Sequence, residues 1–156
     1  GVRHQKNFSM ILLDIDWFKK INDDYGHAAG DDVLKAIALT LKQKVRKSDI
    51  LARWGGEEFI IFLPDTNKLA AVKLANVIRK KIARMVISHD GRSLTITASF
   101  GVASVNDQIN ELEHLIKLAD IALYKAKNSG RNIVCSMKEL VKAKAETKVN
   151  NIHSIR

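Results

Sequence analysis

Residues 50–63 read Ile50-Leu51-Ala52-Arg53-Trp54-Gly55-Gly56-Glu57-Glu58-Phe59-Ile60-Ile61-Phe62-Leu63. Two runs rich in apolar and β-branched residues flank a pair of glycines, which is the pattern of two strands joined by a tight turn. A Gly-Gly pair supplies the positive φ angles that a two-residue turn requires. The stretch therefore predicts a β-hairpin, with strands at residues 50–54 and 57–63.

Helices and strands alternate on both sides of this hairpin. Residues 8–13 form an apolar run that ends in acids, which predicts a buried strand. Residues 30–47 carry apolar side chains at helical spacing, with Asp31 and Asp32 in the first turn, where the helix dipole favours them. The patterns after the hairpin predict a helix capped by Pro64-Asp65-Thr66 and running to about Ile87, a strand at 94–102, a helix at 112–126 ended by Gly130, and a strand at 132–135.

The order strand, helix, hairpin, helix, strand, helix, strand predicts an α+β fold. Two successive strand–helix–strand units of this kind form a split βαβ, ferredoxin-like core. Its mainly antiparallel sheet is covered by helices, which gives an α/β sandwich.

Length and composition bound the class of protein. The chain has 156 residues and 46% hydrophobic content, which suits one globular domain. Its 26 Lys and Arg against 17 Asp and Glu leave a net charge of +9, which excludes an acidic disordered domain and favours anionic partners. The single cysteine excludes a disulfide framework and fits a cytoplasmic protein, and the apolar runs are far shorter than the ~20 residues that span a bilayer. We expect a domain over residues 1–135 and a basic, solvated tail over residues 136–156.

Two acidic clusters follow apolar or glycine-rich segments. Asp14-Ile15-Asp16 ends the first predicted strand, and Glu57-Glu58 follows the glycine pair. Each cluster can be a solvated strand end or hairpin tip, or a set of oxygen ligands for a hard cation. If the hairpin packs beside the first strand, Asp14 and Glu57 converge, and glycines without side chains let a ligand approach the backbone. That arrangement, completed by substrate phosphates, is typical of a magnesium site in nucleotide chemistry.

Three further polar clusters admit both a structural and a binding interpretation. Within residues 19–31, Asn22 and Asp31 suit the donors of a guanine base, although the segment can equally be a capped loop before a helix. Lys127 and Arg131 flank a predicted helix C-terminus, where cations either are stabilised by the helix dipole or bind a phosphate tail. Residues 46–49 form an Arg-x-x-Asp pattern that by itself indicates no more than surface charge.

Together these clusters resemble the GGDEF family of diguanylate cyclases. The signature is Gly55-Gly56-Glu57-Glu58-Phe59, with the permitted Glu at its third position. Residues 14–23, with Gly26-His27 and Gly30-Asp31, are similar to the long upstream motif of the family. Residues 119–127, with Gly130-Arg131-Asn132, are similar to its closing motif. The three blocks occur in the family's order across most of residues 8–135, and they imply the fold of nucleotide cyclases and polymerase palms.

The resemblance implies a magnesium-dependent nucleotidyltransferase, with manganese as an alternative ion. Two GTP molecules would condense into cyclic di-GMP and two pyrophosphates, through attack of each 3′-hydroxyl on the other nucleotide's α-phosphorus. By position, Asp14, the Ile15 carbonyl and Glu57 would hold the metal. Glu57 would also help to deprotonate the hydroxyl, with Glu58 close by, and Lys19 would stabilise charge on the phosphates.

The resemblance also implies where the nucleotide binds. Asn22 and Asp31 would recognise guanine, with His27 nearby, and Lys127 and Arg131 would hold the terminal phosphates. Gly55 and Gly56 would let the substrate approach the backbone of the hairpin. Each domain would bind one GTP, so that two copies of the chain would face each other as a transient homodimer.

Arg46 and Asp49 match a product site of the family, five residues before the first signature glycine. An arginine can clamp a phosphate or a purine edge while the aspartate accepts from guanine, so cyclic di-GMP would act as product and inhibitor. One feature departs from the family: the chain starts without the amphipathic Asp-x-Leu-Thr-Gly-Leu-x-Asn-Arg helix that usually precedes the domain. We therefore expect a cytoplasmic domain that can be the end of a larger sensor protein.

Two other functions compete with the cyclase. A catalytically weak module that senses GTP or cyclic di-GMP is one, but such relatives usually lose signature acids, and Asp14, Glu57 and Glu58 are all present. A ferredoxin-like domain that binds RNA or DNA is the other, and it would need exposed aromatic residues on its sheet. Aromatic residues make up only 6% of the chain, so we expect neither nucleic-acid binding nor membrane contact from this segment.

Overall fold

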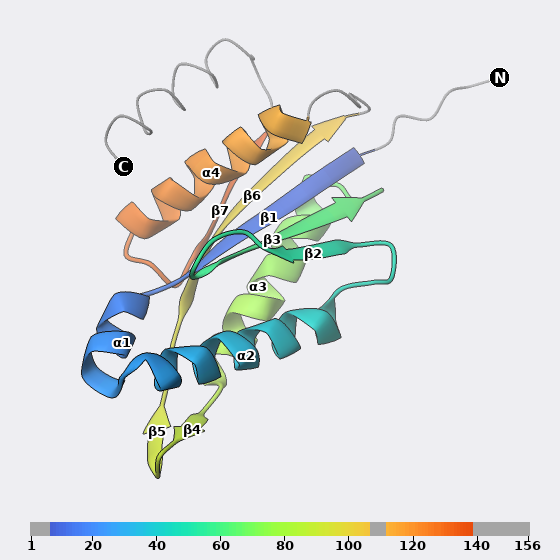
Figure 1. The fold of residues 1–156 in the computed structure, drawn as a ribbon. Helices are drawn as coiled ribbons and strands as arrows, with labels where there is room; N and C mark the ends of the chain where they lie inside the picture. Colours follow the sequence, from blue (N-terminus) through green and yellow to red (C-terminus); the bar gives the residue numbers. More distant parts are fainter. Residues whose placement is uncertain (1–6, 107–111, 139–156) are drawn as a thin grey trace, which may run out of the picture.

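The computed structural model describes residues 7–106 and 112–138. In this part of the chain a five-stranded sheet has the strand order β2-β3-β1-β6-β7, and β4 and β5 form a small hairpin (Figure 1). The elements are β1 (Asn7–Ile15), α1 (Phe18–Tyr25), α2 (His27–Lys44), β2 (Ile50–Arg53), β3 (Glu58–Pro64), α3 (Lys68–Arg84), β4 (Ile87–His89), β5 (Arg92–Leu94), β6 (Ala98–Asn106), α4 (Leu112–Asn128) and β7 (Val134–Lys138).

The strands β1, β2, β3 and β6 form the predicted split βαβ core. β1 pairs antiparallel with both β3 and β6, and β2 pairs antiparallel with β3. β1 and β2 therefore run in the same direction on either side of β3. α4 and β7 extend this core, and β7 lies parallel to β6 at the edge of the sheet. The expected α+β fold, with a mainly antiparallel sheet covered by helices, is confirmed.

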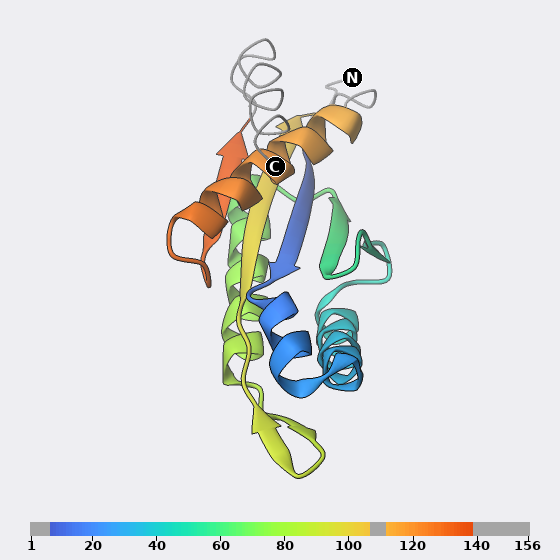
Figure 2. The same ribbon diagram turned by 60° about the vertical axis from the view of Figure 1, so that its left-hand side comes forward.

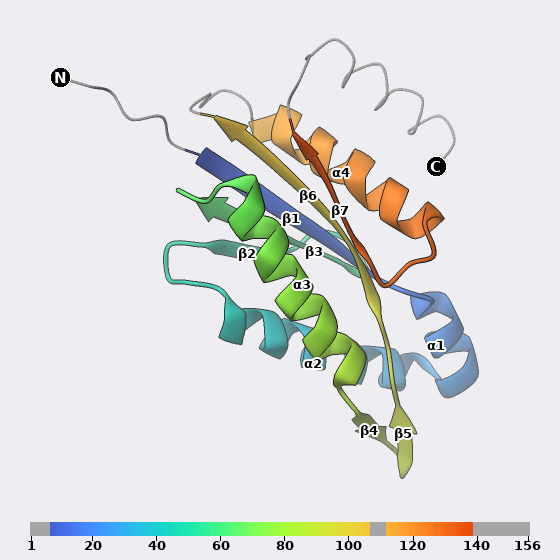
Figure 3. The same ribbon diagram turned by 180° about the vertical axis from the view of Figure 1, so that it is seen from behind.

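Helices cover both faces of the sheet, with α2 and α3 on one face and α4 on the other (Figures 2 and 3). β1 is the middle strand, and its apolar run is continuous because both of its faces are buried. Ile11 and Leu13 pack with α2 and α3, whereas Met10 and Leu12 pack with α4. Phe59 and Phe100 are also buried in the core, so they offer no stacking platform for nucleic acid.

The predicted hairpin forms, but the prediction of a two-residue Gly-Gly turn is wrong. β2 ends at Arg53 and β3 begins at Glu58, so the connection is longer. Neither Gly55 nor Gly56 has a positive φ. The Gly55 N–H donates to the Glu58 carbonyl at 3.3 Å, and the Arg53 guanidinium donates to the carbonyls of Gly55 and Gly56 at 3.2 and 2.5 Å. Hydrogen bonds from the backbone and from Arg53 thus close the loop, and it does not depend on positive φ angles at the two glycines.

Several predicted boundaries around the helices are corrected by local hydrogen bonds. Residues 18–25 form the short helix α1, where the alternative was a loop, and α2 begins at His27 because Gly26 separates the two helices with φ 93°. α3 is capped by Asn67, whose side chain accepts from the Ala70 N–H at 2.8 Å, and not by residues 64–66. It ends at Arg84, so Ile87 belongs to the next strand.

The single strand predicted at 94–102 is in fact two strands joined by an extended segment. Asp90 and Gly91, with φ of 47° and 73°, form the turn between β4 and β5, and β6 starts only at Ala98. At the other end, β7 continues to Lys138. Residues 136–138 therefore belong to the sheet and not to the expected tail, and the rest of that tail lies outside the described residues.

Helix α4 approaches the sheet closely at Gly101. A Cβ there would lie 2.2 Å from the Ala119 carbonyl oxygen and 2.3 Å from the Leu123 nitrogen of α4. Because backbone atoms cannot move aside as a flexible side chain can, we expect Gly101→Ala to lower the free energy of unfolding by about 3 kcal/mol. Urea denaturation measures this. Gly56→Ala is the matched control, since nothing lies within 4 Å of its added Cβ, and equal effects of the two changes would contradict the prediction.

Candidate active site

The candidate site lies where β1 leaves the core. Asp14 is 5% exposed, and its carboxylate accepts a hydrogen bond from the Lys127 ammonium at 2.5 Å. The Ile15 N–H donates to the Glu57 carbonyl at 3.2 Å, which holds the start of the hairpin's second strand against the end of β1. The convergence of Asp14 and Glu57 predicted from the sequence is therefore present. Both line one hollow of about 190 Å³, together with Ile15, Asp16, Trp17, Phe18, Lys19, Lys127 and Arg131.

The charges of this hollow are coupled. Partial burial raises the pKa of Glu57 above its ordinary value, and the nearby Asp14 carboxylate raises it further through charge repulsion and a hydrogen bond. The Lys127 ammonium acts in the opposite direction and lowers the same pKa. Two carboxylates thus share one site in which the Lys127 ammonium is hydrogen-bonded to Asp14, so further positive charge would stabilise their ionised forms.

The end of α4 supplies the cations of the site. Gly130, with φ 102°, ends the helix as predicted, and Arg131 and Asn132 follow with φ of 62° and 47°. This turn brings the Arg131 guanidinium back to donate to the Lys127 carbonyl at 2.9 Å. Lys19 enters the same hollow from the first turn of α1. The structure therefore gathers Lys19, Lys127 and Arg131 around the two carboxylates.

The residues predicted to recognise a base lie on α1 and α2, outside this hollow. Asn22 is on α1, and its buried Oδ1 has no hydrogen-bond partner. Gly30 of α2 packs so closely that an added Cβ would lie 1.9 Å from that oxygen. Asp31 and His27 are exposed on the first turns of α2. The Asn22 oxygen is thus a buried acceptor that has no hydrogen-bond partner among the described residues.

Arg46 and Asp49 form a separate site in the loop between α2 and β2. The Arg46 guanidinium donates to Asp49 at 2.9 Å and also to the Pro64 carbonyl and the Thr66 hydroxyl, both at 2.9 Å. The Asp49 side chain is 1% exposed, whereas that of Arg46 is 56% exposed. Hydrogen bonding to Asp49 raises the pKa of Arg46. The Arg-x-x-Asp pattern is thus a preformed ion pair that presents one side of its arginine to solvent.

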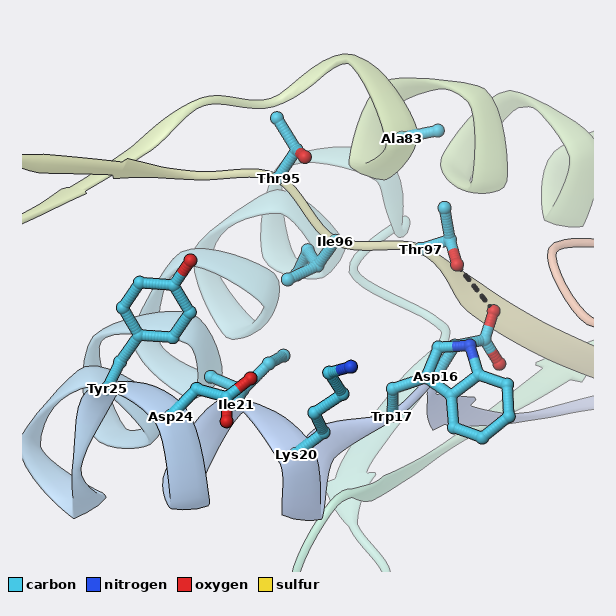
Figure 4. Close-up of a pocket in the computed structure, with 10 residues that line it drawn as sticks. All are labelled: Asp16, Trp17, Lys20, Ile21, Asp24, Tyr25, Ala83, Thr95, Ile96 and Thr97. Atoms are coloured by element: carbon cyan, nitrogen blue, oxygen red, sulfur yellow. Dashed lines mark hydrogen bonds between the residues drawn. The ribbon is translucent and has the colours of Figure 1, made fainter.

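Sequence reasoning missed two residues that organise the site, Arg53 and Trp17, and it gave Asp16 only as part of an acidic cluster that could be solvated or bind a cation. Arg53 closes the glycine loop. Asp16 is 4% exposed and accepts hydrogen bonds from the Thr97 hydroxyl, seen in Figure 4, and from the Ser99 hydroxyl, both at 2.6 Å. The sequence signalled only that an acid followed a buried strand, since these hydroxyls are more than eighty residues away.

A second hollow, of about 570 Å³, lies on the other side of α1, between this helix, the end of α3 and residues 95–97 (Figure 4). None of the predicted site residues lines it. Its walls are mostly apolar side chains and threonines, with Lys20 and Asp24 at the rim. The larger hollow is therefore not where the carboxylates and cations converge.

Among the described residues no three His, Cys, Asp or Glu side chains form a metal cluster. A metal ion at Asp14 and Glu57 would need a backbone carbonyl or a ligand's phosphates to complete its shell. Within the same residues, no helix is both long and apolar enough to cross a membrane.

Comparison with known proteins identifies the family. A family model described as "Diguanylate cyclase, GGDEF domain" matches residues 2–133. The chain therefore belongs to the GGDEF family. Diguanylate cyclase A of Treponema denticola is 43% identical over 140 residues, which cover 89% of this chain and 38% of that protein. The response regulator PleD of Caulobacter vibrioides is 43% identical over 128 residues, which cover 81% of this chain and 28% of that protein. The chain thus spans about a third of the length of these curated relatives.

Solved structures share the fold. The active GGEEF domain of a diguanylate cyclase from Vibrio cholerae has a TM-score of 0.78 and 36% identity, covering 86% of this chain and 85% of that one. The GGDEF domain of DgcB from Caulobacter crescentus, in complex with c-di-GMP, has a TM-score of 0.78 and 30% identity, covering 83% of this chain and 77% of that one.

The raised pKa of Glu57 predicts a pH-dependent stability. Because the folded protein holds the Glu57 proton more tightly than the unfolded chain, Glu57 lowers stability progressively as the pH rises from below its ordinary pKa of 4.5 through the raised one. In metal-free buffer, Glu57→Gln should stabilise the protein more at about pH 7 than at about pH 4. Urea denaturation at both pH values measures this. The exposed Glu113 provides the control variant Glu113→Gln, and an equal effect of Glu57→Gln at both pH values would refute the prediction.

Proposed function

We propose that this chain is a diguanylate cyclase domain that condenses two GTP molecules into cyclic di-GMP and two pyrophosphates. The observation that carries the proposal is the convergence of Asp14 and Glu57 with Lys19, Lys127 and Arg131 in one hollow. Carboxylates that hold a cation and basic side chains that bind phosphates are the two requirements of phosphoryl transfer. Membership of the GGDEF family and the names of its relatives support the same reaction.

A divalent metal ion fits the donor set. The Asp14 and Glu57 carboxylates are hard oxygen ligands, and burial together with the neighbouring Asp14 charge raises the pKa of Glu57, so a bound cation would stabilise its ionised form. We propose that these carboxylates and the Ile15 carbonyl hold Mg²⁺, or Mn²⁺ in its place. The bound ion would neutralise charge on the phosphates and on the attacking oxygen.

The side chains around this position account for the rest of the reaction. The 3′-oxygen of one nucleotide forms a bond to the α-phosphorus of the other, and the bond from that phosphorus to pyrophosphate breaks. Glu57, with Glu58 beside it in the hairpin, accepts the hydroxyl proton. Lys19 stabilises the negative charge that develops on the phosphate oxygens. Two such steps close the ring.

Binding of the nucleotide is divided between two regions of the structure. Lys127 and Arg131 hold the terminal phosphates, which lie furthest from the attacked phosphorus. Asn22 and Asp31 accept hydrogen bonds from guanine, and the unpaired Asn22 oxygen supports this assignment. His27 lies at the start of α2, the helix that carries Asp31. Gly55 and Gly56 have no side chains and so leave the hairpin loop open to the substrate.

Incubation with GTP and Mg²⁺, followed by chromatography of the products, tests the cyclase. Glu57→Gln keeps the size of the side chain but removes a charge that the metal and the transferred proton both need, so we expect activity to fall at least about 100-fold. The control Glu113→Gln should retain activity. A wild-type protein that binds GTP but releases no product would instead be a nucleotide sensor, and full activity of Glu57→Gln would remove the assigned metal and base.

The reaction requires two copies of the chain, because each copy supplies one set of phosphate-binding residues. We propose a transient homodimer in which two identical faces bring their substrates to about 3–3.5 Å. The net charge of +9 opposes association, so specific activity should rise with protein concentration. Assays over the range in which the free protein is monomeric measure this, and a constant specific activity would contradict the dimer.

We also propose that the Arg46–Asp49 pair binds cyclic di-GMP and makes the enzyme product-inhibited. The half-exposed guanidinium is already oriented by Asp49, Pro64 and Thr66, so its solvent-facing edge can meet a phosphate or a guanine. Arg46→Ala should raise the inhibition constant for added cyclic di-GMP at least about tenfold and leave the initial rate unchanged. Lys47→Ala is the control for loss of a neighbouring cation. Unchanged inhibition of the Arg46 variant would place the product elsewhere.

A further inference from the structure

The Arg131 guanidinium lies over an aromatic ring at the edge of the carboxylate hollow. Its central carbon is 4.2 Å from the centroid of the Trp17 indole, well within the range of a cation–π contact. Both side chains line the hollow that contains Asp14 and Glu57. A guanidinium that stacks with its face keeps its N–H groups at its edge, and within residues 7–106 and 112–138 the one hydrogen bond that it donates goes to the Lys127 carbonyl, at 2.9 Å. The stacked arginine therefore still offers donors to an anion.

Trp17 holds this position with an unusual backbone. It precedes α1 in the left-handed region, with φ 59° and ψ 33°, which is rare for a bulky residue. Its side chain is also 63% exposed, so burial does not explain why a large apolar ring occupies this position. Backbone conformations of this kind concentrate where a side chain has to be aimed. Here the conformation places the indole beneath the guanidinium.

One buried carboxylate ties together the two backbones that carry this pair. Asp16, directly before Trp17, accepts a hydrogen bond from the Asn132 N–H at 3.0 Å, directly after Arg131. The same carboxylate accepts hydrogen bonds from the Ser99 hydroxyl and from the Thr97 hydroxyl, the latter drawn in Figure 4. The turn that contains Arg131, in which Gly130, Arg131 and Asn132 all have positive φ, is thus attached to the end of β1 by a largely buried carboxylate.

We propose that Trp17 is a positioning residue, which holds the Arg131 guanidinium ready for the terminal phosphates of GTP from a backbone anchored by Asp16. This inference rests on the proposed function of Arg131. The physical reason is conformational entropy. The indole contact already orders the long Arg131 side chain in the free protein, so substrate binding does not have to order it. Trp17 would then affect the binding of β- and γ-phosphates and not the chemical step.

The test separates terminal phosphates from the rest of the nucleotide. We compare dissociation constants for GMP and for a GTP analogue with a methylene in place of the α–β bridging oxygen, which cannot release pyrophosphate. Trp17→Leu removes the π face but keeps an apolar side chain. It should weaken analogue binding about two- to fivefold, the range of an exposed cation–π contact, and leave GMP binding unchanged. Trp17→Phe retains an aromatic face and should restore most of the affinity.

Steady-state kinetics and a matched control complete the comparison. In Trp17→Leu the KM for GTP should rise by a similar factor while kcat stays within about twofold, because the lost interaction is made in the ground state and the transition state alike. Tyr25→Leu breaks a second cation–π pair in the described part of the chain, in which Arg92 lies 5.1 Å from the Tyr25 ring, and it should change neither dissociation constant. Equal weakening of GMP and analogue binding by Trp17→Leu would show a general structural defect and would overturn the inference.

A double-mutant cycle distinguishes failure of the inference from failure of the proposed function. Arg131→Ala should weaken analogue binding roughly ten- to a hundredfold, and Trp17→Leu should have no further effect in that background. If Arg131→Ala leaves analogue binding intact, the phosphate-binding role of Arg131 is wrong. If Arg131→Ala weakens it but Trp17→Leu weakens it equally in both backgrounds, Trp17 does not act through Arg131 and the inference fails.

Discussion

Burial of β1 on both faces is the constraint on which the rest of the structure depends. As the middle strand, β1 packs against α2 and α3 on one side and α4 on the other, so every side chain along most of its length must be apolar or paired. The first acids can appear only where the strand leaves the two helical layers. Asp14 stands at that point, still buried, and its charge is balanced by Lys127 from α4.

The site is built from elements that end at the same edge of the sheet. The hairpin contributes Glu57, held against Ile15 by a backbone hydrogen bond, and α4 contributes its last lysine and the turn that follows. Asp14 and Lys127 are more than a hundred residues apart in the sequence, so packing and not chain connectivity sets the distance between them. Helix α4, whose last turn carries Lys127, packs closely on the sheet at Gly101.

Much of the fold followed from periodicity. The apolar run of β1, the helical stripes of α2 and α4 and the hairpin flanks were all predicted, and so was the split βαβ order. The errors lie where a short element depends on tertiary contacts. α1 has only eight residues and few periodic positions, and the β4–β5 hairpin has three residues in each strand. Neither element is long enough to show a recognisable periodicity in the sequence.

The sequence by itself determined which chemical groups the site contains, because the acids after β1, the acids of the glycine loop and the basic residues around Gly130 are covalently bound to recognisable strand and helix ends. Only the tertiary structure decided which of them share a hollow. It placed Asn22 and Asp31 outside the carboxylate cluster, paired Arg46 with Asp49, and brought Asp16 and Trp17 into contact with Thr97, Asn132 and Arg131. No local pattern contains the proximity of these residues, since packing and not sequence spacing brings them together.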